Sequence, residues 1–341
     1  MYYKGFNPER HEGAGPAPSP ELKKELNLRT IHKLFVCGLL AVAMLTTRQL
    51  NAQNLTLEGQ TGGFLTPTAY VVYTEKGKTF SHPAVGYHLI NASKVIGTIQ
   101  TFSIVEGYAN RAEAGYTRSV HTFGNSGSST PLDLSSLWNS NGMNIFNGKV
   151  VAIKDGQFGP WTPGVAGGFL VRTGDKFVSS AVSREVGGSG SAYTNEDVFV
   201  AVTKTWLHPP LPFLVNVGWK ATNATIFGIG GQSTRFGGRF FGGLGIPFPG
   251  PFKTAIVPSV GFTQEPHTAK NLNLILAGGA HLPTTLDYAV RVTQREAPHF
   301  TFDFGFGQVA GNIGTTAPQM GSLPVNLEAR HVLGMGLSYR Y

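Results

Sequence analysis

The last ten residues alternate between large apolar side chains and small or polar ones. The apolar set is Leu333, Met335, Leu337, Tyr339 and Tyr341, and the residues between them are Gly334, Gly336, Ser338 and Arg340. Because successive side chains of a β-strand point to opposite faces, this segment has one apolar face and one small or polar face. In a transmembrane β-barrel alternate side chains face lipid, and aromatic residues mark the lipid–water interface. The pattern therefore favours a strand inserted in a membrane.

The same residues are similar to a known targeting signal. Gly334, Gly336, Tyr339 and Tyr341 resemble the C-terminal motif by which outer-membrane barrels are recognised for insertion. We therefore expect the bacterial outer membrane as the location, its lipid as the surroundings, and the barrel-assembly machinery as a partner.

Most of the chain after residue 80 follows the same two-residue period. Phe300, Phe302, Phe304 and Phe306 alternate with Thr301, Asp303 and Gly305. Further strands are predicted at 80–91, 95–105, 112–121, 145–154, 165–174, 197–206, 213–219, 235–246, 254–262, 271–281 and 286–292. Each is about ten residues long, the length that a tilted strand needs to cross a bilayer. The fold class predicted is an all-β, closed antiparallel transmembrane barrel of about 12–14 strands.

Composition agrees with this interpretation. Only 13% of the residues are charged and 45 are glycine, whereas soluble domains have about 25% charged residues. No apolar run reaches the roughly 18 residues of a transmembrane helix. A soluble β-sandwich is the alternative. The formal net charge of +8 is not concentrated in a Lys/Arg cluster of five or more, so no nucleic-acid partner is expected.

Connections fall into two classes. Short ones are predicted at 106–110, 207–212, 247–252 and 282–285, and longer polar ones at 124–143, 184–195 and 223–234. Barrels of this class have short periplasmic turns and long outer loops. If the strands cross the membrane alternately upward and downward, short and long connections alternate correctly through about residue 285. Beyond that residue the alternation fails, so one predicted strand near 286–327 or within 165–194 is wrong.

The N-terminal residues carry an export pattern. Basic residues precede the apolar run Leu34–Leu45, and small residues follow it up to Ala52. We interpret 29–52 as a signal peptide and 1–28 as a disordered leader or a misannotated start. The one cysteine, Cys37, lies in the apolar run and is interpreted as a small apolar residue.

Residues 53–79 are predicted to form an N-terminal lumenal or periplasmic segment, and 80–341 the barrel. Pro67 and the pair Gly62–Gly63 make the stretch 59–69 a poor wall strand. With the Gly-Tyr and Glu-x-Gly-Tyr-Thr motifs that follow up to Thr117, it resembles the YjbH-type outer-membrane proteins linked to exopolysaccharide production. The resemblance covers roughly residues 59–120. It implies that the Gly-x-x-Thr-Pro-Thr-Ala stretch lies at or inside the barrel mouth, and it implies an accessory role in polysaccharide export as an alternative function.

Charges on the polar phase of the strands are the candidate functional residues. The predicted lumen charges are Arg111, Glu113, Lys220, Arg235, Arg239, Asp287, Arg291, Asp303 and Arg340. They form either a constriction that favours small anionic or polar solutes, or ion pairs that close the barrel. Ionised groups at membrane depth are costly unless paired or wet, so either way these charges face one another or water.

An outer-membrane hydrolase is the catalytic alternative. It needs a nucleophile with a histidine partner. His88, His121, His281 and His331 and the serines 103, 119, 259 and 338 lie on predicted strands but in no recognisable motif. No catalytic residue, cofactor or metal site is predicted. The function expected is therefore a pore, transport or envelope-assembly barrel without catalysis.

Overall fold

The structure is a computed structural model. It describes residues 54–92, 97–122, 141–174, 194–207, 212–224, 232–265, 284–295, 299–308, 310–313, 325–329 and 331–340. Contacts divide the chain into two units, 1–45 and 46–341, and every described residue belongs to the second. The predicted leader 1–28 and signal peptide 29–52 lie outside the described residues. None of the described residues forms a helix long and apolar enough to span a membrane.

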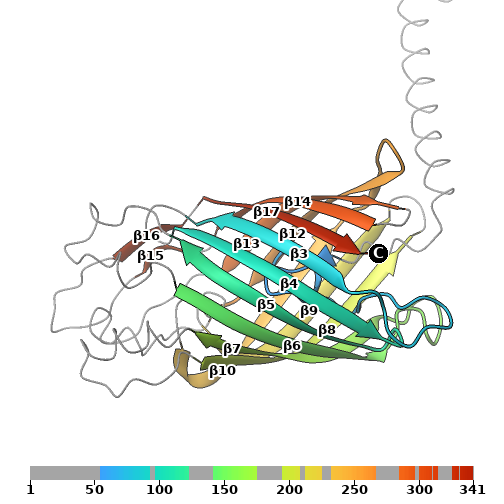
Figure 1. Ribbon diagram of the computed structural model, residues 1–341, viewed down its shortest axis with the longest axis horizontal. Helices are drawn as coiled ribbons and strands as arrows, with labels where there is room; N and C mark the ends of the chain where they lie inside the picture. The colour runs from blue at the N-terminus through green and yellow to red at the C-terminus, as the bar shows by residue number, and fades with distance from the viewer. Residues whose placement is uncertain are drawn as a thin grey trace, which may run out of the picture. The chain divides into compact units, whose positions relative to one another are not determined.

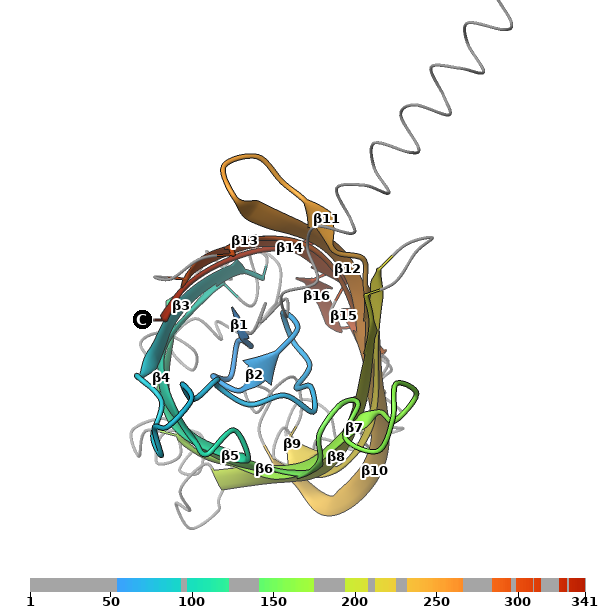
Figure 2. The same cartoon turned by 90° about the vertical axis from the view of Figure 1, so that its right-hand side faces the viewer.

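Twelve antiparallel strands form a closed ring (Figures 1 and 2). They are β3 (Ala84–Asn91), β4 (Thr98–Tyr108), β5 (Ala112–Thr122), β6 (Asn141–Ile153), β7 (Gly164–Gly174), β8 (Thr194–Trp206), β9 (Phe213–Ala224), β10 (Gln232–Gly245), β12 (Thr254–Thr263), β13 (Thr285–Gln294), β14 (His299–Gln308) and β17 (Val332–Arg340). The ring closes where β17 pairs with β3, from Leu333 opposite Asn91 to Arg340 opposite Ala84. The predicted closed barrel is thus confirmed, with twelve strands.

Five short strands lie outside this ring of pairings. β11 (Phe248–Pro249) extends the hairpin between β10 and β12, and β15 (Ala310–Ile313) pairs with β16 (Val325–Ala329). β1 (Asn54–Leu55) and β2 (Thr61–Gly62) pair with each other. Seen along the barrel, β1 and β2 lie inside the ring (Figure 2).

The predicted order of connections needs one correction. β12 pairs directly with β13, from Thr254 opposite Gln294 to Thr263 opposite Thr285. The ring is therefore complete without the predicted strand at 271–281, which lies outside the described residues together with residues 282–283 of the predicted turn. The predicted strands at 165–174 and 286–292, near which the wrong strand was expected, are the wall strands β7 and β13. Without the strand at 271–281 the wall has twelve strands, an even number, so the chain enters and leaves the wall at the same end of the barrel. The first strand then begins, and the last strand ends, at the end of the barrel that carries the short turns (Figure 1).

The two faces of the wall differ as the two-residue period predicts. On β14, Phe300, Phe302, Phe304 and Phe306 are 36–57% exposed on the outside. Thr301 and Asp303, between them, are 3% and 1% exposed and face inward. The same contrast holds on β4, where Phe102 and Ile104 are exposed and Thr101 and Ser103 are buried. The barrel thus has an apolar exterior and a polar interior.

Candidate functional site: the occupied lumen

The segment 54–74, which we call the plug, lies inside the barrel (Figure 2). No residue from Asn54 to Val72 is exposed, although the segment belongs to no wall strand. Glu58 is the only residue of the plug whose side chain is charged at neutral pH. Because buried backbone groups need partners, the question is which wall groups supply them.

Glu113 on β5 fastens the plug at two points. Its carboxylate accepts hydrogen bonds from the backbone and hydroxyl of Thr61, the former at 2.9 Å. It also accepts one from the backbone N–H of Val72 at 2.9 Å. Lys149, directly opposite on β6, pairs with Glu113 at 3.0 Å and donates to the carbonyl of Thr61 at 2.8 Å. One ion pair of the wall thus binds the plug at two places, Thr61 and Val72.

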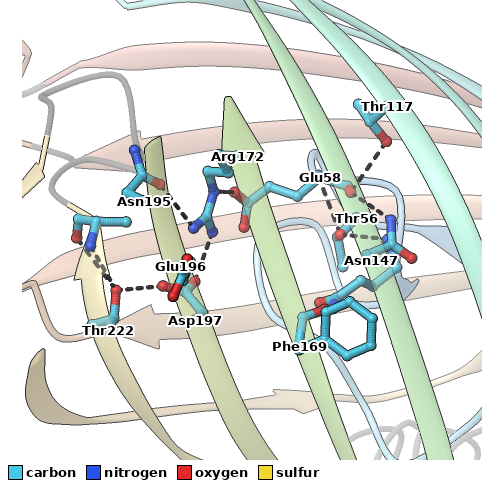
Figure 3. A network of polar contacts seen from close by, with 12 residues as sticks. Thr56, Glu58, Thr117, Asn147, Phe169, Arg172, Asn195, Glu196, Asp197 and Thr222 are labelled. Atoms are coloured by element: carbon cyan, nitrogen blue, oxygen red, sulfur yellow. Dashed lines mark hydrogen bonds and ion pairs between the residues drawn. The ribbon is translucent and has the colours of Figure 1, made fainter. Parts of the chain in front are cut away.

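Arg172 on β7 connects the plug to a second carboxylate of the wall (Figure 3). Its Nε donates to Glu58 Oε1 at 2.6 Å, and its Nη2 donates to Asp197 Oδ2 at 2.6 Å. The Nη1 donates to Asn195 Oδ1 at 3.2 Å. The hydroxyl of Thr222 on β9 also donates to Asp197. Arg172 is fully buried, so these partners replace the water that its guanidinium would otherwise bind.

A third group of contacts lies across the ring. Arg291 on β13 pairs with Asp303 on β14 at 2.8 Å, and the two residues face each other in register. Arg291 Nη1 donates to the carbonyl of Gly62 at 3.0 Å, and Asn54 donates its side-chain N–H to Asp303. His88 Nε2 on β3 lies 3.1 Å from the carbonyl oxygen of Leu55. The start of the plug is therefore held from this side as well.

The end of the plug is anchored near the short turns. The backbone N–H of Ala69 donates to Thr203 Oγ1 at 2.8 Å. The hydroxyl of Tyr70 donates to Asp155 at 2.8 Å, and Asp155 pairs with Lys204 at 2.5 Å. Burial, with a smaller contribution from the charge of Asp155, raises the pKa of the Tyr70 phenol above its ordinary value. Tyr70 therefore stays neutral and keeps its hydrogen-bond donor.

Two glycines of β17 make room for one ring of the plug and one ring of the wall. A Cβ at Gly334 would lie 2.6 Å from the ring of Phe64, and a Cβ at Gly336 would lie 2.5 Å from the ring of His88. Phe64 and His88 pack edge to face, with 5.9 Å between ring centroids. The two glycines of the predicted insertion signal thus face the lumen, while the ring of Tyr339 lies tilted against that of Phe300 on the next strand, with 4.9 Å between centroids. Tyr341 lies outside the described residues, and the signal itself stays a prediction.

The predicted lumen charges are placed as follows. Glu113, Arg291 and Asp303 contact the plug or hold a group that does. Lys220, Asp287 and Arg340 are buried on inward positions, and Arg239, opposite Lys220 in register, donates to the carbonyl of Glu265. The side chain of Arg235 lies outside the part that the structure describes. Arg111 is a correction: it lies in the turn before β5, and its guanidinium contacts Val151, Ala152 and Gln157 instead of the lumen.

Sequence reasoning missed four central residues: Glu58, Lys149, Arg172 and Asp197. The predicted strands contained Lys149, Arg172 and Asp197, but their inward phase was not assigned. On β8 the signal was present, because Asp197 alternates with the exterior residues Val198, Val200 and Val202. Glu58 was detectable only as the single charge in a long neutral stretch.

The catalytic alternative gains no geometric support. His88 is engaged with the plug backbone, and Ser259 donates to the carbonyl of Ala289. His331 is exposed before β17, while His281 and the side chain of His121 lie outside the described residues. Within the described ranges no group of three or more His, Cys, Asp or Glu could hold a metal ion.

The exterior of the ring decides the location. Large apolar side chains are exposed on the outer faces of the wall strands, while ion pairs lie within. Acyl chains solvate such a surface, and the closed ring satisfies the strand edges that lipid cannot. The protein is a β-barrel of the bacterial outer membrane. Its apolar exterior contacts lipid.

Comparison with known proteins adds a likeness of architecture. No family model and no curated protein matches the chain. Among solved structures it is similar to a KdgM porin, at 7% identity and a TM-score of 0.41 over 76% of this chain and 99% of that one. It is also similar to the COG4313 outer membrane channel from Pseudomonas putida F1, at 10% identity and a TM-score of 0.40 over 79% and 98%.

Proposed function

We propose that the protein is a non-catalytic outer-membrane channel for small polar solutes, and that its own plug closes it. The observation that carries this proposal is a complete twelve-strand ring that encloses a segment with no exposed residue from Asn54 to Val72. The wall needs no extra strand from this segment. Its removal leaves a closed ring with a polar interior, which is the arrangement of a pore.

The charges of the wall support a plug that can move. The pairs Glu113–Lys149, Arg172–Asp197 and Arg291–Asp303 each join two neighbouring strands. When the plug leaves, each of these buried charges keeps an opposite charge beside it. The cost of leaving a buried charge unpaired, about 3–5 kcal/mol, is thereby avoided. Within the plug only Glu58 loses an ionic partner, and the wall then becomes wet.

A reversible crosslink tests whether the plug must move. A Cβ added at Gly164 would lie 3.4 Å from the Cβ of Ala69 in the plug, close to the distance of about 3.8 Å that disulfides require. The variant Ala69→Cys/Gly164→Cys, with Cys37→Ser to remove the native thiol, is reconstituted in planar bilayers. We expect the oxidised protein to be silent and the reduced protein to show channel openings.

The single variants Ala69→Cys and Gly164→Cys serve as controls and should be insensitive to the redox state. Equal steady conductance in the oxidised and reduced double variant would show that solutes pass the plug without displacing it. Silence of the reduced, folded protein under all voltages would contradict the channel proposal itself.

A role as an accessory of exopolysaccharide export is the second proposal. It rests on the resemblance of residues 59–120 to YjbH-type proteins, and the Thr-Pro-Thr-Ala stretch of that resemblance lies against the lumen wall, where Asn216 binds the carbonyl of Pro67 at 2.9 Å. Deletion of the gene should then reduce surface polysaccharide while the reduced crosslink variant stays silent. Conductance with unchanged polysaccharide favours the channel.

A further inference from the structure

Arg172 is held by the wall in a fixed orientation, independently of the plug. Asp197 binds Nη2 at 2.6 Å and Asn195 binds Nη1 at 3.2 Å. Asp197 in turn accepts a hydrogen bond from Thr222 and interacts with the charge of Lys220. These partners leave the Nε side of the guanidinium directed at the plug (Figure 3). The donor is therefore preorganised, whichever acceptor stands in front of it.

The acceptor that stands there is the carboxylate of Glu58, the only charge of the plug. One of its oxygens lies 2.6 Å from Nε, slightly shorter than the roughly 2.7–2.9 Å of most charge-assisted N–H···O bonds. The backbone carbonyl of Glu58 also accepts hydrogen bonds from Thr117 at 3.1 Å and Asn147 at 3.2 Å. The plug thus places one carboxylate at the Arg172 guanidinium, and all its other contacts with the wall are made by neutral groups.

The described interior of the barrel has one more base than acids. Apart from Lys204 with its partner Asp155, the bases on described inward positions are Lys149, Arg172, Lys220, Arg239, Arg291 and Arg340, and the acids are Glu113, Asp197, Glu265, Asp287 and Asp303. Glu58 reduces this excess in the closed state. Without it the lumen attracts anions, since charged walls of low dielectric raise the local concentration of the opposite charge.

We propose that the Nε side of Arg172 is a binding site for carboxylate-bearing solutes, and that Glu58 occupies this site in the closed channel as an internal competitor. The proposal rests on the channel function proposed above. A solute carboxylate takes the hydrogen bond of Arg172 Nε, the carboxylate of Glu58 becomes hydrated, and the plug loses its one ionic contact. A guanidinium favours planar carboxylates because its N–H groups match their geometry.

The probe is succinate, with 1,4-butanediol as the uncharged molecule of the same carbon chain. The full-length protein is recorded in planar bilayers while either compound is added at constant ionic strength. We expect succinate, and not butanediol, to increase the open probability. Glu58→Gln keeps the shape of the plug but replaces a charge-assisted hydrogen bond by a weaker neutral one. Its half-maximal succinate concentration should fall about tenfold.

The matched control is Glu75→Gln, the same substitution at an exposed position just after the plug, which should behave as the unmodified protein. Arg172→Gln combined with Glu58→Gln should abolish the response to succinate. If that double variant fails to fold, Arg172→Lys replaces it; it keeps the charge but loses the Nε donor, and should need a higher succinate concentration.

The outcomes separate the two proposals. A double variant that responds to succinate as Glu58→Gln does, or butanediol acting as well as succinate, overturns the Arg172 site while the channel stands. Openings whose probability does not change with succinate in any variant also overturn the Arg172 site. Absence of openings in all variants, including the reduced crosslink variant, contradicts the channel function first.

Discussion

The plug meets two kinds of wall. Toward β5–β8 it meets charged pairs, represented by Glu113 with Lys149 and by Arg172 with Asp197. Toward β17 it meets glycines, and Phe64 packs into the space above Gly334. Charged pairs persist when the plug leaves, whereas a fit of shape exists only while it is present. The charged side therefore determines which polar groups must find new partners when the plug leaves. The glycine side determines the position that the plug takes in the barrel.

The largest effect is expected from Glu113→Gln, on the charged side. Glutamine leaves Lys149 buried without its carboxylate and weakens three hydrogen bonds to the plug. Breaking one partner of a buried pair costs about 3–5 kcal/mol. Urea unfolding in detergent should show this loss. Glu106→Gln, at an outward position of β4, is the control and should leave the unfolding midpoint in place. A stability equal to the parent protein would show that the pair does not hold the plug.

On the glycine side, Gly334→Leu should expel Phe64. The added side chain would collide with a ring already 2.6 Å from the position of its Cβ, and overpacking of this kind costs about 1–3 kcal/mol. We expect more frequent openings and faster proteolysis within the plug. Gly307→Ala, where the nearest atoms lie at 3.4 and 3.8 Å, should change neither. If both variants open equally, the shape of β17 does not position the plug.

The smallest effect is expected from Tyr70→Phe, which removes the hydroxyl bound to Asp155 and Thr205. The loss of these hydrogen bonds should cost about 1 kcal/mol. Because the pKa of Tyr70 is raised by burial, the folded state favours the neutral phenol. Its contribution is complete below the unfolded pKa of about 10 and is lost as pH rises beyond it. The alkaline decline of stability, followed by circular dichroism, should be shallower in Tyr70→Phe than in the parent.

The wall could be predicted because its determinant is local. A side chain that alternates between lipid and lumen leaves a two-residue period, and Phe300–Phe306 shows it without reference to any other strand. The strand at 271–281 was predicted on that period, yet the ring closes without it. Period alone cannot tell a wall strand from another alternating segment, since membership in the ring depends on a partner far along the chain, as β12 depends on β13.

The site was harder to predict for the same physical reason. Glu113, Arg291 and Asp303 were identified from their phase, but their partners in the plug were not, because Thr61 and Gly62 contribute backbone groups that every residue has. Arg111 was assigned to the lumen by extending the phase of β5 beyond its first residue, where the chain already turns. Charge pattern thus locates the donors and acceptors of the wall, and only the folded chain shows what they bind.

The place where the ring closes has a consequence for biogenesis. β3, which follows the plug in the chain, pairs with β17, the wall strand farthest from it in the described sequence. Leu55 lies against the position of Gly86 on β3, and Phe64 lies against that of Gly334 on β17. Both strands of the seam therefore pack against apolar side chains of the plug. Ring closure and plug docking are thus coupled, because the same two strands take part in both.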